Sequence, residues 1–165
     1  MKTDLQTSRL SLTDLSIEHS EFVLELVNSP EWLKFIGERN VKNDDEAKAY
    51  IEKILANPNV QYWVIRLNDS NLAAGIITLI KRDYLEHHDL GFALLPQFSK
   101  KGFAFEAADS IIESLKLNPD HQKILAVTIP DNTNSVQLLE KLGFQFEKTI
   151  NRANENLSIY GLNVK

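Results

Sequence analysis

Residues 90–105, LGFALLPQFSKKGFAF, predict a strand, a loop and the start of a helix in that order. Residues 90–95 form a short apolar run, and the proline after it ends the strand because proline has no N–H for a ladder. From Ala104 the apolar positions recur at the spacing of an amphipathic helix. The loop ends in KKG at 100–102, so the free N–H groups of the helix N-terminus lie beside two cations. The segment therefore predicts a site for an anion such as phosphate.

Length and composition favour one domain, residues 1–165. The chain has 165 residues, of which 43% are hydrophobic, which is enough for one sizeable core and too little for two. It has no cysteine, so disulfides, thiolate metal sites and a cysteine nucleophile are excluded. We expect no metal site.

Charge and hydropathy argue against two classes of partner. The formal net charge is -5 and the pI about 5.4, whereas nucleic-acid binding requires a basic surface. No stretch approaches the ~20 apolar residues of a membrane span, and no signal-peptide h-region follows Met1. We therefore expect a cytoplasmic protein that binds neither nucleic acid nor membrane.

Apolar alternation and capping residues predict the other elements. Strands are expected at 5–13, 62–67, 72–80 and 124–129. Helices are expected after the caps Ser16 and Asn43. Two aromatic residues, Trp32 and Phe35, follow the helix breaker Pro30. They belong either to the core or to the floor of a substrate pocket.

Residues 132–144, NTNSVQLLEKLGF, predict a short capped helix. Asn132 is a good N-cap, and Gly143 lies where a helix often ends in a residue with positive φ. Phe144 then packs back on the helix. Local rules alone require nothing more of this segment.

Together these two segments resemble those of the GNAT acyltransferase superfamily. SKKGFA at 99–104 is similar to its coenzyme A loop, Arg/Gln-x-x-Gly-x-Gly/Ala, and departs from it at the first position. GFAFEA at 102–107 resembles the run GYATEA of the branch that acetylates the N-termini of ribosomal proteins (RimJ/RimL-like). Residues 132–144 match a second family segment, Asn-x-x-Ala/Ser followed by Glu-Lys-x-Gly-Phe, at the expected distance.

The resemblance covers nearly the whole chain and implies a mixed α+β fold. This GNAT fold has a central, mostly antiparallel, twisted sheet of about six to seven strands with about four helices packed against it. One parallel strand pair lies at the coenzyme site. The last two strands are expected at 145–150 and 157–164, joined as a hairpin by a loop at 151–156.

The resemblance also implies acetyl-CoA as cosubstrate and direct attack of an amine on the thioester. The acceptor is then an amine-bearing small molecule or a protein N-terminus, and the enzyme a monomer or homodimer. Family likeness assigns the thioester end of the coenzyme to the strand before the proline. The coenzyme-binding residues that it implies are Leu94, Ser99, Lys100, Lys101, Gly102, Phe103, Ala104, Asn132 and Ser135.

The catalytic candidates are Asp89, His88 and Ser135. A base is needed because a primary amine, with a pKa of about 10, is mostly charged at neutral pH. Asp89 is either that base or a solvated acid at the start of a strand, and His88 is the second candidate base. Many relatives place a tyrosine acid where this chain has Leu139, so Ser135 or solvent would protonate the thiolate.

Two alternatives remain open at this stage. Without catalysis, the chain would be a coenzyme A binding or sensing domain. If it retains only the fold, it would be a protein-interaction domain whose Lys100-Lys101-Gly102 loop holds no coenzyme.

Overall fold

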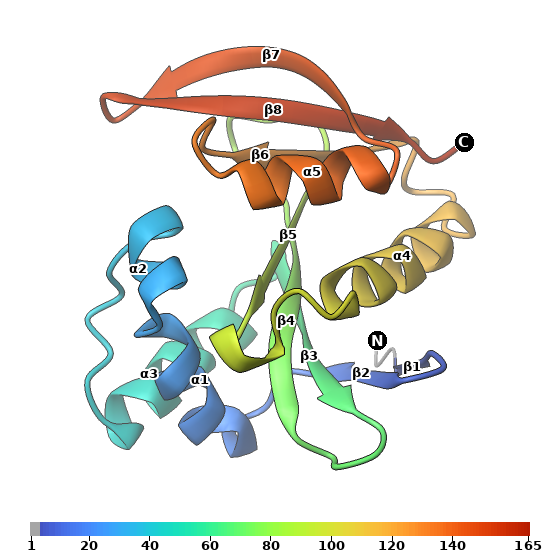
Figure 1. Cartoon of the computed structure of the whole chain (residues 1–165). Helices are drawn as coiled ribbons and strands as arrows, with labels where there is room; N and C mark the ends of the chain where they lie inside the picture. Colours follow the sequence, from blue (N-terminus) through green and yellow to red (C-terminus); the bar gives the residue numbers. More distant parts are fainter. Residues whose placement is uncertain (1–3) are drawn as a thin grey trace.

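The structure, a computed structural model, describes residues 4–165. Its strands form one eight-stranded sheet in the order β1-β2-β3-β4-β5-β6-β8-β7 (Figure 1). The bounds are β1 (Leu5–Gln6), β2 (Leu10–Asp14), β3 (Val60–Leu67), β4 (Ala73–Ile80), β5 (Asp89–Leu94), β6 (Lys123–Thr128), β7 (Gln145–Arg152) and β8 (Glu155–Asn163). Every pair is antiparallel except β5 with β6, which confirms the predicted mixed α+β sheet with one parallel pair.

In the described part of the chain, five α-helices and two short 3₁₀ helices connect the strands. They are α1 (Ser20–Val27), α2 (Pro30–Phe35), α3 (Asp44–Leu55), α4 (Phe103–Lys116), α5 (Thr133–Lys141), η1 (Ile17–His19) and η2 (Pro96–Phe98). The sequence pattern does not predict helix α2, because Pro30 indicates a break in the chain after α1. Proline also suits the first turn of a helix, where its missing N–H has no partner to lose. Trp32 on α2 is buried in the core.

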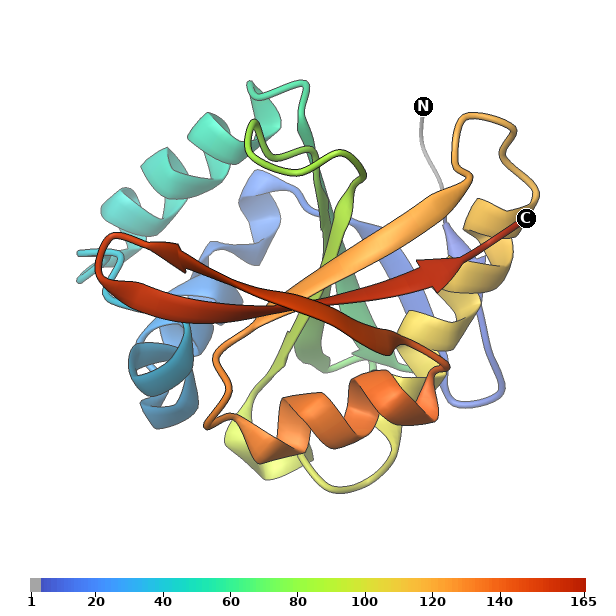
Figure 2. The same ribbon diagram turned by 90° about the horizontal axis from the view of Figure 1, so that it is seen from above.

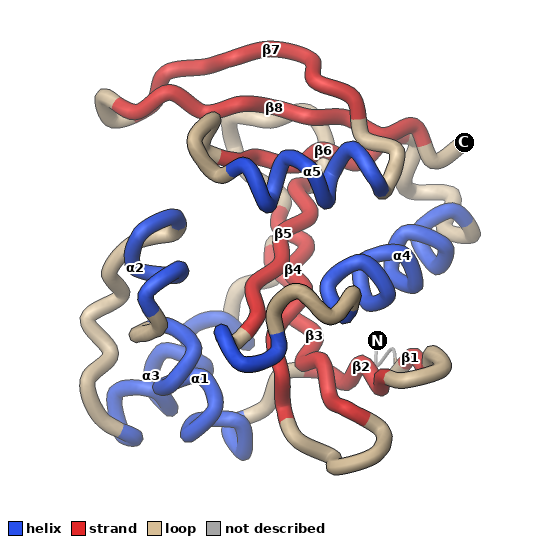
Figure 3. Tube along the Cα trace, viewed as in Figure 1, coloured by secondary structure: helices blue, strands red, loops and turns tan. Residues whose placement is uncertain are grey.

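The core lies in two layers, one on each side of the sheet (Figures 1 and 3). Successive strand residues point to opposite faces. Trp63 and Ile65 on β3 therefore pack toward α4, whereas Val64 between them packs toward α1 and α3. The layer between the sheet and α4 also includes Leu139 of α5. No helix within residues 4–165 combines the length and the apolar character needed to cross a bilayer.

The N-terminal segment differs from the single strand predicted at 5–13. A turn at Thr7–Arg9 divides it into β1 and β2, which pair with each other through Leu5 and Leu12. The Thr7 hydroxyl accepts a hydrogen bond from the Leu10 N–H at 3.0 Å, which closes the turn. The segment at 5–13 alternates like one strand, but the polar residue Thr7 stabilises a turn within it, so the segment forms two strands.

The C-terminal hairpin is tighter than the loop predicted at 151–156. Strands β7 and β8 pair up to Arg152 and Glu155. Only Ala153 and Asn154 lie between them, with φ of 52° and 64°. Two successive positive φ values are typical of a two-residue turn whose twist matches that of the strands.

Candidate active site

Strands β5 and β6 are paired at one point and then separate. Their register contains the single pair Asp89 and Leu125 within the described chain. The Leu125 N–H donates to the His88 carbonyl at 2.8 Å. In a continued parallel ladder, the next bond would run from the Val127 N–H to the Leu90 carbonyl. The Val127 N–H donates instead to Oδ1 of Asp89 at 3.2 Å. From this point the two strands run in different directions (Figures 1 and 2).

The separation leaves backbone groups of β5 without a strand partner. The backbone N–H and C=O of alternate residues point to the same side of a strand. Since the His88 carbonyl faces β6, the backbone groups of Phe92 and Leu94 face β6 too. The described residues offer them no partner there. Leu94, one of the coenzyme-binding residues that the resemblance implies, thus has a backbone N–H without a strand partner among residues 4–165.

The loop after β5 presents free amides at the start of α4. The first helical bond runs from the Glu106 N–H to the Gly102 carbonyl at 3.1 Å. The N–H groups of Phe103, Ala104 and Phe105 precede it and have no acceptor in the part of the chain described. Gly102 has φ of 82°, a left-handed conformation that suits glycine. Aligned free amides at a helix N-terminus form an anion site.

The neighbouring loop residues differ in how they are used. Lys100 and Lys101 are exposed, and Lys100 has φ of 61°, unusual for a residue with a side chain. The Ser99 hydroxyl donates to the Pro96 carbonyl at 2.7 Å, so it closes the η2 turn. Two cations therefore border the free amides, while Ser99 keeps only its oxygen lone pairs for a ligand.

Two hollows border the helix N-termini. A hollow of about 430 Å³ is lined by Arg9, Gly102, Glu106 and Lys141, among others. A second of about 330 Å³ lies between α2 and the start of α5 and includes Asn132. Both segments singled out in the sequence therefore contribute to concave surface.

Helix α5 begins as predicted. Oδ1 of Asn132 accepts the Ser135 N–H at 3.3 Å, which confirms the cap. The Asn132 side-chain NH₂ has no acceptor among residues 4–165. Gly143 has φ of 101°, and the Phe144 N–H bonds back to the Leu139 carbonyl at 2.9 Å. Ser135 is half-buried in the first turn, so its hydroxyl lies near the same helix end.

Asp89 is not a solvated acid, which corrects one of the two readings of this residue. Its side chain is 6% exposed, and Oδ2 accepts a hydrogen bond from Arg82 Nε at 2.9 Å. Burial raises the pKa of Asp89 to about 6, against the opposing effects of Arg82 and of the Val127 amide. The carboxylate lies where β5 and β6 begin to separate, with a pKa close to neutrality.

His88 points elsewhere. Its ring packs edge to face against His121, in the loop between α4 and β6, with ring centroids 4.8 Å apart. Burial lowers its pKa, and the nearby His121 and Lys81 lower it further. His88 and Asp89 are consecutive residues, but their side chains contact different neighbours.

The position of the usual tyrosine acid is apolar and inaccessible. Leu139 is 1% exposed and belongs to the main core. Tyr160 on β8 is also buried in that core, and its ring packs edge to face against that of Phe146. Ser135, the residue named from the sequence as a candidate acid, is half-buried and lies outside that core.

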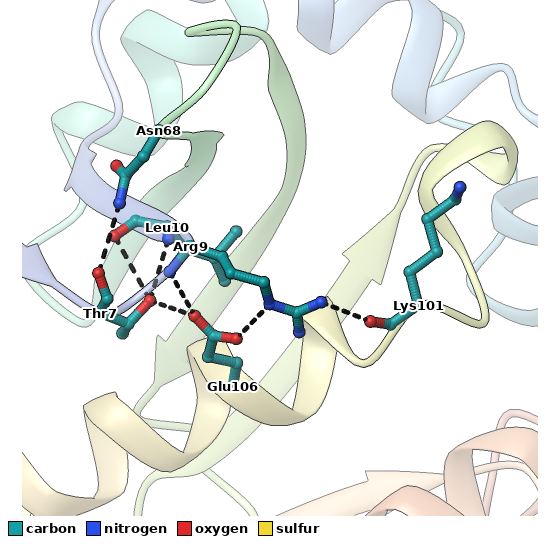
Figure 4. A network of polar contacts seen from close by, with 6 residues as sticks. All are labelled: Thr7, Arg9, Leu10, Asn68, Lys101 and Glu106. Atoms are coloured by element: carbon teal, nitrogen blue, oxygen red, sulfur yellow. Dashed lines mark hydrogen bonds and ion pairs between the residues drawn. The ribbon is translucent and has the colours of Figure 1, made fainter.

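Two arginines beside the site were missed by sequence reasoning. Arg82 pairs with Asp89 from the loop between β4 and β5. Arg9 bonds both Glu106 and the Lys101 carbonyl from the turn between β1 and β2 (Figure 4). The pairing of Arg82 had a signal in the sequence, because Asp89 follows it by only 7 residues. Arg9 and Glu106 are 97 residues apart, and no local rule joins them.

The chain matches a known protein family and a curated relative over most of its length. The Acetyltransferase (GNAT) domain family matches residues 9–145. An uncharacterised N-acetyltransferase of Bacillus subtilis, YnaD, is 26% identical over 155 residues, covering 92% of this chain and 90% of that one.

Solved structures share the fold over nearly the whole chain. A GNAT-family acetyltransferase from Bacillus anthracis aligns with a TM-score of 0.82 at 21% identity, covering 98% of this chain and 99% of that one. RimL, a ribosomal L7/L12 alpha-N-protein acetyltransferase in complex with coenzyme A, aligns with a TM-score of 0.84 at 14% identity, covering 98% of both chains. These likenesses concern the fold.

Proposed function

Because the chain belongs to the GNAT acetyltransferase family, and is thereby an acetyl-CoA-dependent acyltransferase, we propose that it acetylates a primary amine of a small molecule or of a protein N-terminus. The amine nitrogen attacks the thioester carbonyl carbon directly. The C–N bond forms as the C–S bond breaks, and coenzyme A leaves as a thiolate that takes up a proton.

The observation that carries this proposal is the separation of β5 from β6. It leaves a free strand edge between an anion site at one end and a buried carboxylate at the other. In the proposal, the pyrophosphate binds the amides of Phe103 and Ala104, and the pantetheine arm runs along β5. The Leu94 N–H holds the thioester end, where a backbone donor stabilises the developing oxyanion.

Asp89 is the proposed proton acceptor. Its pKa of about 6 leaves it ionised at neutral pH yet basic enough to take a proton from the ammonium through a water molecule. His88 remains the second candidate. Ser135, half-buried in the first turn of α5, or solvent is proposed to protonate the thiolate.

A panel of amines, mixed with acetyl-CoA and followed by release of free thiol, tests the proposal. The panel contains polyamines, amino sugars, amino acids and peptides with free N-termini, and a thermal shift with acetyl-CoA is measured in parallel. Thiol release with one class of amine is expected. A thermal shift without thiol release for any amine favours the coenzyme-sensing alternative. Neither signal favours the protein-interaction alternative.

A further inference from the structure

Arg9 belongs to no segment that the acetyl-transfer chemistry requires, yet it contacts both the loop at Lys100–Gly102, here called the anion loop, and the first turn of α4 (Figure 4). Its Nε donates to Oε1 of Glu106 at 2.7 Å, and its Nη1 donates to the Lys101 carbonyl at 2.9 Å. Its guanidinium also lies over the ring of Phe103, 4.5 Å from the centroid. The turn between β1 and β2 is thereby tied to the loop that begins α4.

The contact with Lys101 falls at the strained part of the loop. Lys100 and Gly102, on either side of Lys101, both have left-handed backbone, with φ of 61° and 82°. A residue with a side chain keeps this conformation only where its surroundings hold it. Within the described chain, the hydrogen bond from Arg9 is the one that fixes the Lys101 carbonyl. Arg9 therefore holds the loop in the shape that exposes the helix amides.

The ion pair between Arg9 and Glu106 compensates a negative charge at the start of α4. Glu106 places a carboxylate in the first turn of α4, where it would compete with an anionic ligand for the positive end of the helix. Oε1 of this carboxylate accepts from Arg9 Nε, and Oε2 accepts from the Thr7 hydroxyl and the Arg9 N–H. Burial raises the pKa of Glu106, but the bonds from Thr7 and Arg9 outweigh it and lower the pKa. Glu106 is thus ionised, with its charge matched by Arg9.

We propose that Arg9 is a positioning residue for coenzyme binding, which holds the Lys100–Gly102 loop open to phosphate and neutralises Glu106. The inference rests on the proposed function, because the anion is taken to be the pyrophosphate of acetyl-CoA. Arg9 itself need not touch the coenzyme.

Arg9→Ala in the full chain tests the role, with Arg66→Ala as matched control. Arg66 also donates from Nη1 to a turn carbonyl, that of Asn71, at 3.0 Å, and Asn71 also has positive φ, of 60°. Arg9→Ala is expected to raise the KM for acetyl-CoA about tenfold, the order expected from one charge-assisted hydrogen bond. The KM for the amine and kcat at saturating acetyl-CoA are expected to stay unchanged. Arg66→Ala is expected to leave all three unchanged.

A second variant separates the two contributions of Arg9. Adding Glu106→Gln to Arg9→Ala removes the unmatched carboxylate and is expected to recover part of the lost acetyl-CoA affinity. Hydrogen exchange without ligand at the amides of residues 106–108 is expected to become faster in Arg9→Ala, because the start of α4 loses its anchor.

The outcomes are distinct. Wild-type protein that does not bind acetyl-CoA refutes the proposed function. An unchanged KM for acetyl-CoA in Arg9→Ala, or an equal rise in Arg66→Ala, refutes the positioning role. Unchanged exchange at residues 106–108 in Arg9→Ala refutes the anchoring of the loop, whether or not the coenzyme binds.

Discussion

Asp89 carries two tasks with one carboxylate. Oδ1 replaces the Leu90 carbonyl as acceptor for the Val127 N–H, so the side chain ends the parallel ladder. Oδ2 pairs with Arg82. Both bonds are made to the ionised form, yet burial outweighs them and raises the pKa of Asp89 to about 6. The same group therefore helps to separate the strands and titrates near neutrality.

The raised pKa sets the direction of a pH dependence. Asp89 ionises at about 6 in the folded protein and at about 3.9 when unfolded. Its contribution to stability is thus fully present below pH 4 and is lost as pH rises through 6. The proposed base function has the opposite sense, because only the ionised carboxylate accepts a proton. The acetylation rate is expected to rise as pH increases through 6.

Asp89→Asn is expected to lower kcat at neutral pH more than it changes the KM for acetyl-CoA. The variant should lose the rise in rate near pH 6, and higher pH should partly restore the rate because the amine then deprotonates unaided. Steady-state rates measured from pH 5 to 9 check this. Full activity of Asp89→Asn at every pH would make Asp89 structural and His88 the next residue to replace.

Gly102 is the residue at which backbone shape and ligand charge meet. Gly102→Asp is expected to abolish the thermal shift with acetyl-CoA, because it adds a negative charge to the anion site. In the wild type, acetyl-CoA at about a hundred times its Kd should raise the free energy of unfolding by about 2.7 kcal/mol. This corresponds to a rise in Tm of roughly 5–10 °C.

Gly102→Asn is the matched control for that charge. Asn tolerates left-handed backbone about as well as Asp and has nearly the same volume. Its Cβ would meet Nη2 of Arg9 at 3.2 Å, as that of Asp would. Gly102→Asn should therefore keep part of the shift, and an equal loss in both variants would assign the effect to shape alone.

Among the elements, α5 is preceded by an N-cap residue, Asn132, for which we propose a second role in coenzyme binding. Oδ1 of Asn132 caps the helix, and the side-chain NH₂ is free to donate to coenzyme A or to the backbone around it. Asn132→Asp and Asn132→Ser should fold normally yet bind acetyl-CoA more weakly, because both retain the acceptor and lose the NH₂. Asn132→Ala should also lose about 1 kcal/mol of stability.

Thermal melts and titrations with acetyl-CoA separate these effects. Asn132→Ser is the informative variant because it adds no charge. If Asn132→Ser and Asn132→Asp bind like the wild type while Asn132→Ala only melts earlier, the residue is a helix cap and does not contact the coenzyme site.

At the scale of the whole molecule, an acidic protein is proposed to bind a highly anionic coenzyme. The net charge of -5 opposes this ligand at long range, so the two exposed loop cations matter most when little salt is present. Lys100→Ala with Lys101→Ala should weaken acetyl-CoA binding, less than Gly102→Asp does, and more at low than at high ionic strength.

Titrations at two salt concentrations check the prediction. Lys53→Ala with Lys148→Ala is the matched control, since it removes the same charge from exposed positions on α3 and β7. An equal effect of both double variants would show that net charge, and not the loop, accounts for the change.

The sequence by itself determined the local elements and pointed to the two segments of the candidate site. Certain residues begin or end an element, and their effect depends on only a few neighbouring residues. Here they are the proline after β5, Gly102 before α4, and Asn132 and Gly143 at the two ends of α5. Such signals can be read without knowing the fold, and they predicted the strand, the loop and the capped helix. The single parallel pair was expected from the family resemblance. The same reasoning misread 5–13 and Pro30, where one residue type serves two structures.

Only the tertiary structure decided the chemical state of the site. Asp89 became a buried carboxylate because Arg82 approaches it from the loop between β4 and β5, and the Val127 amide from β6. Arg9 came to hold the anion loop although it lies 97 residues from Glu106. Desolvation and long-range pairing depend on which surfaces meet after folding. Periodicity and capping describe a chain only over a few turns, so these effects became visible only once the sheet was assembled.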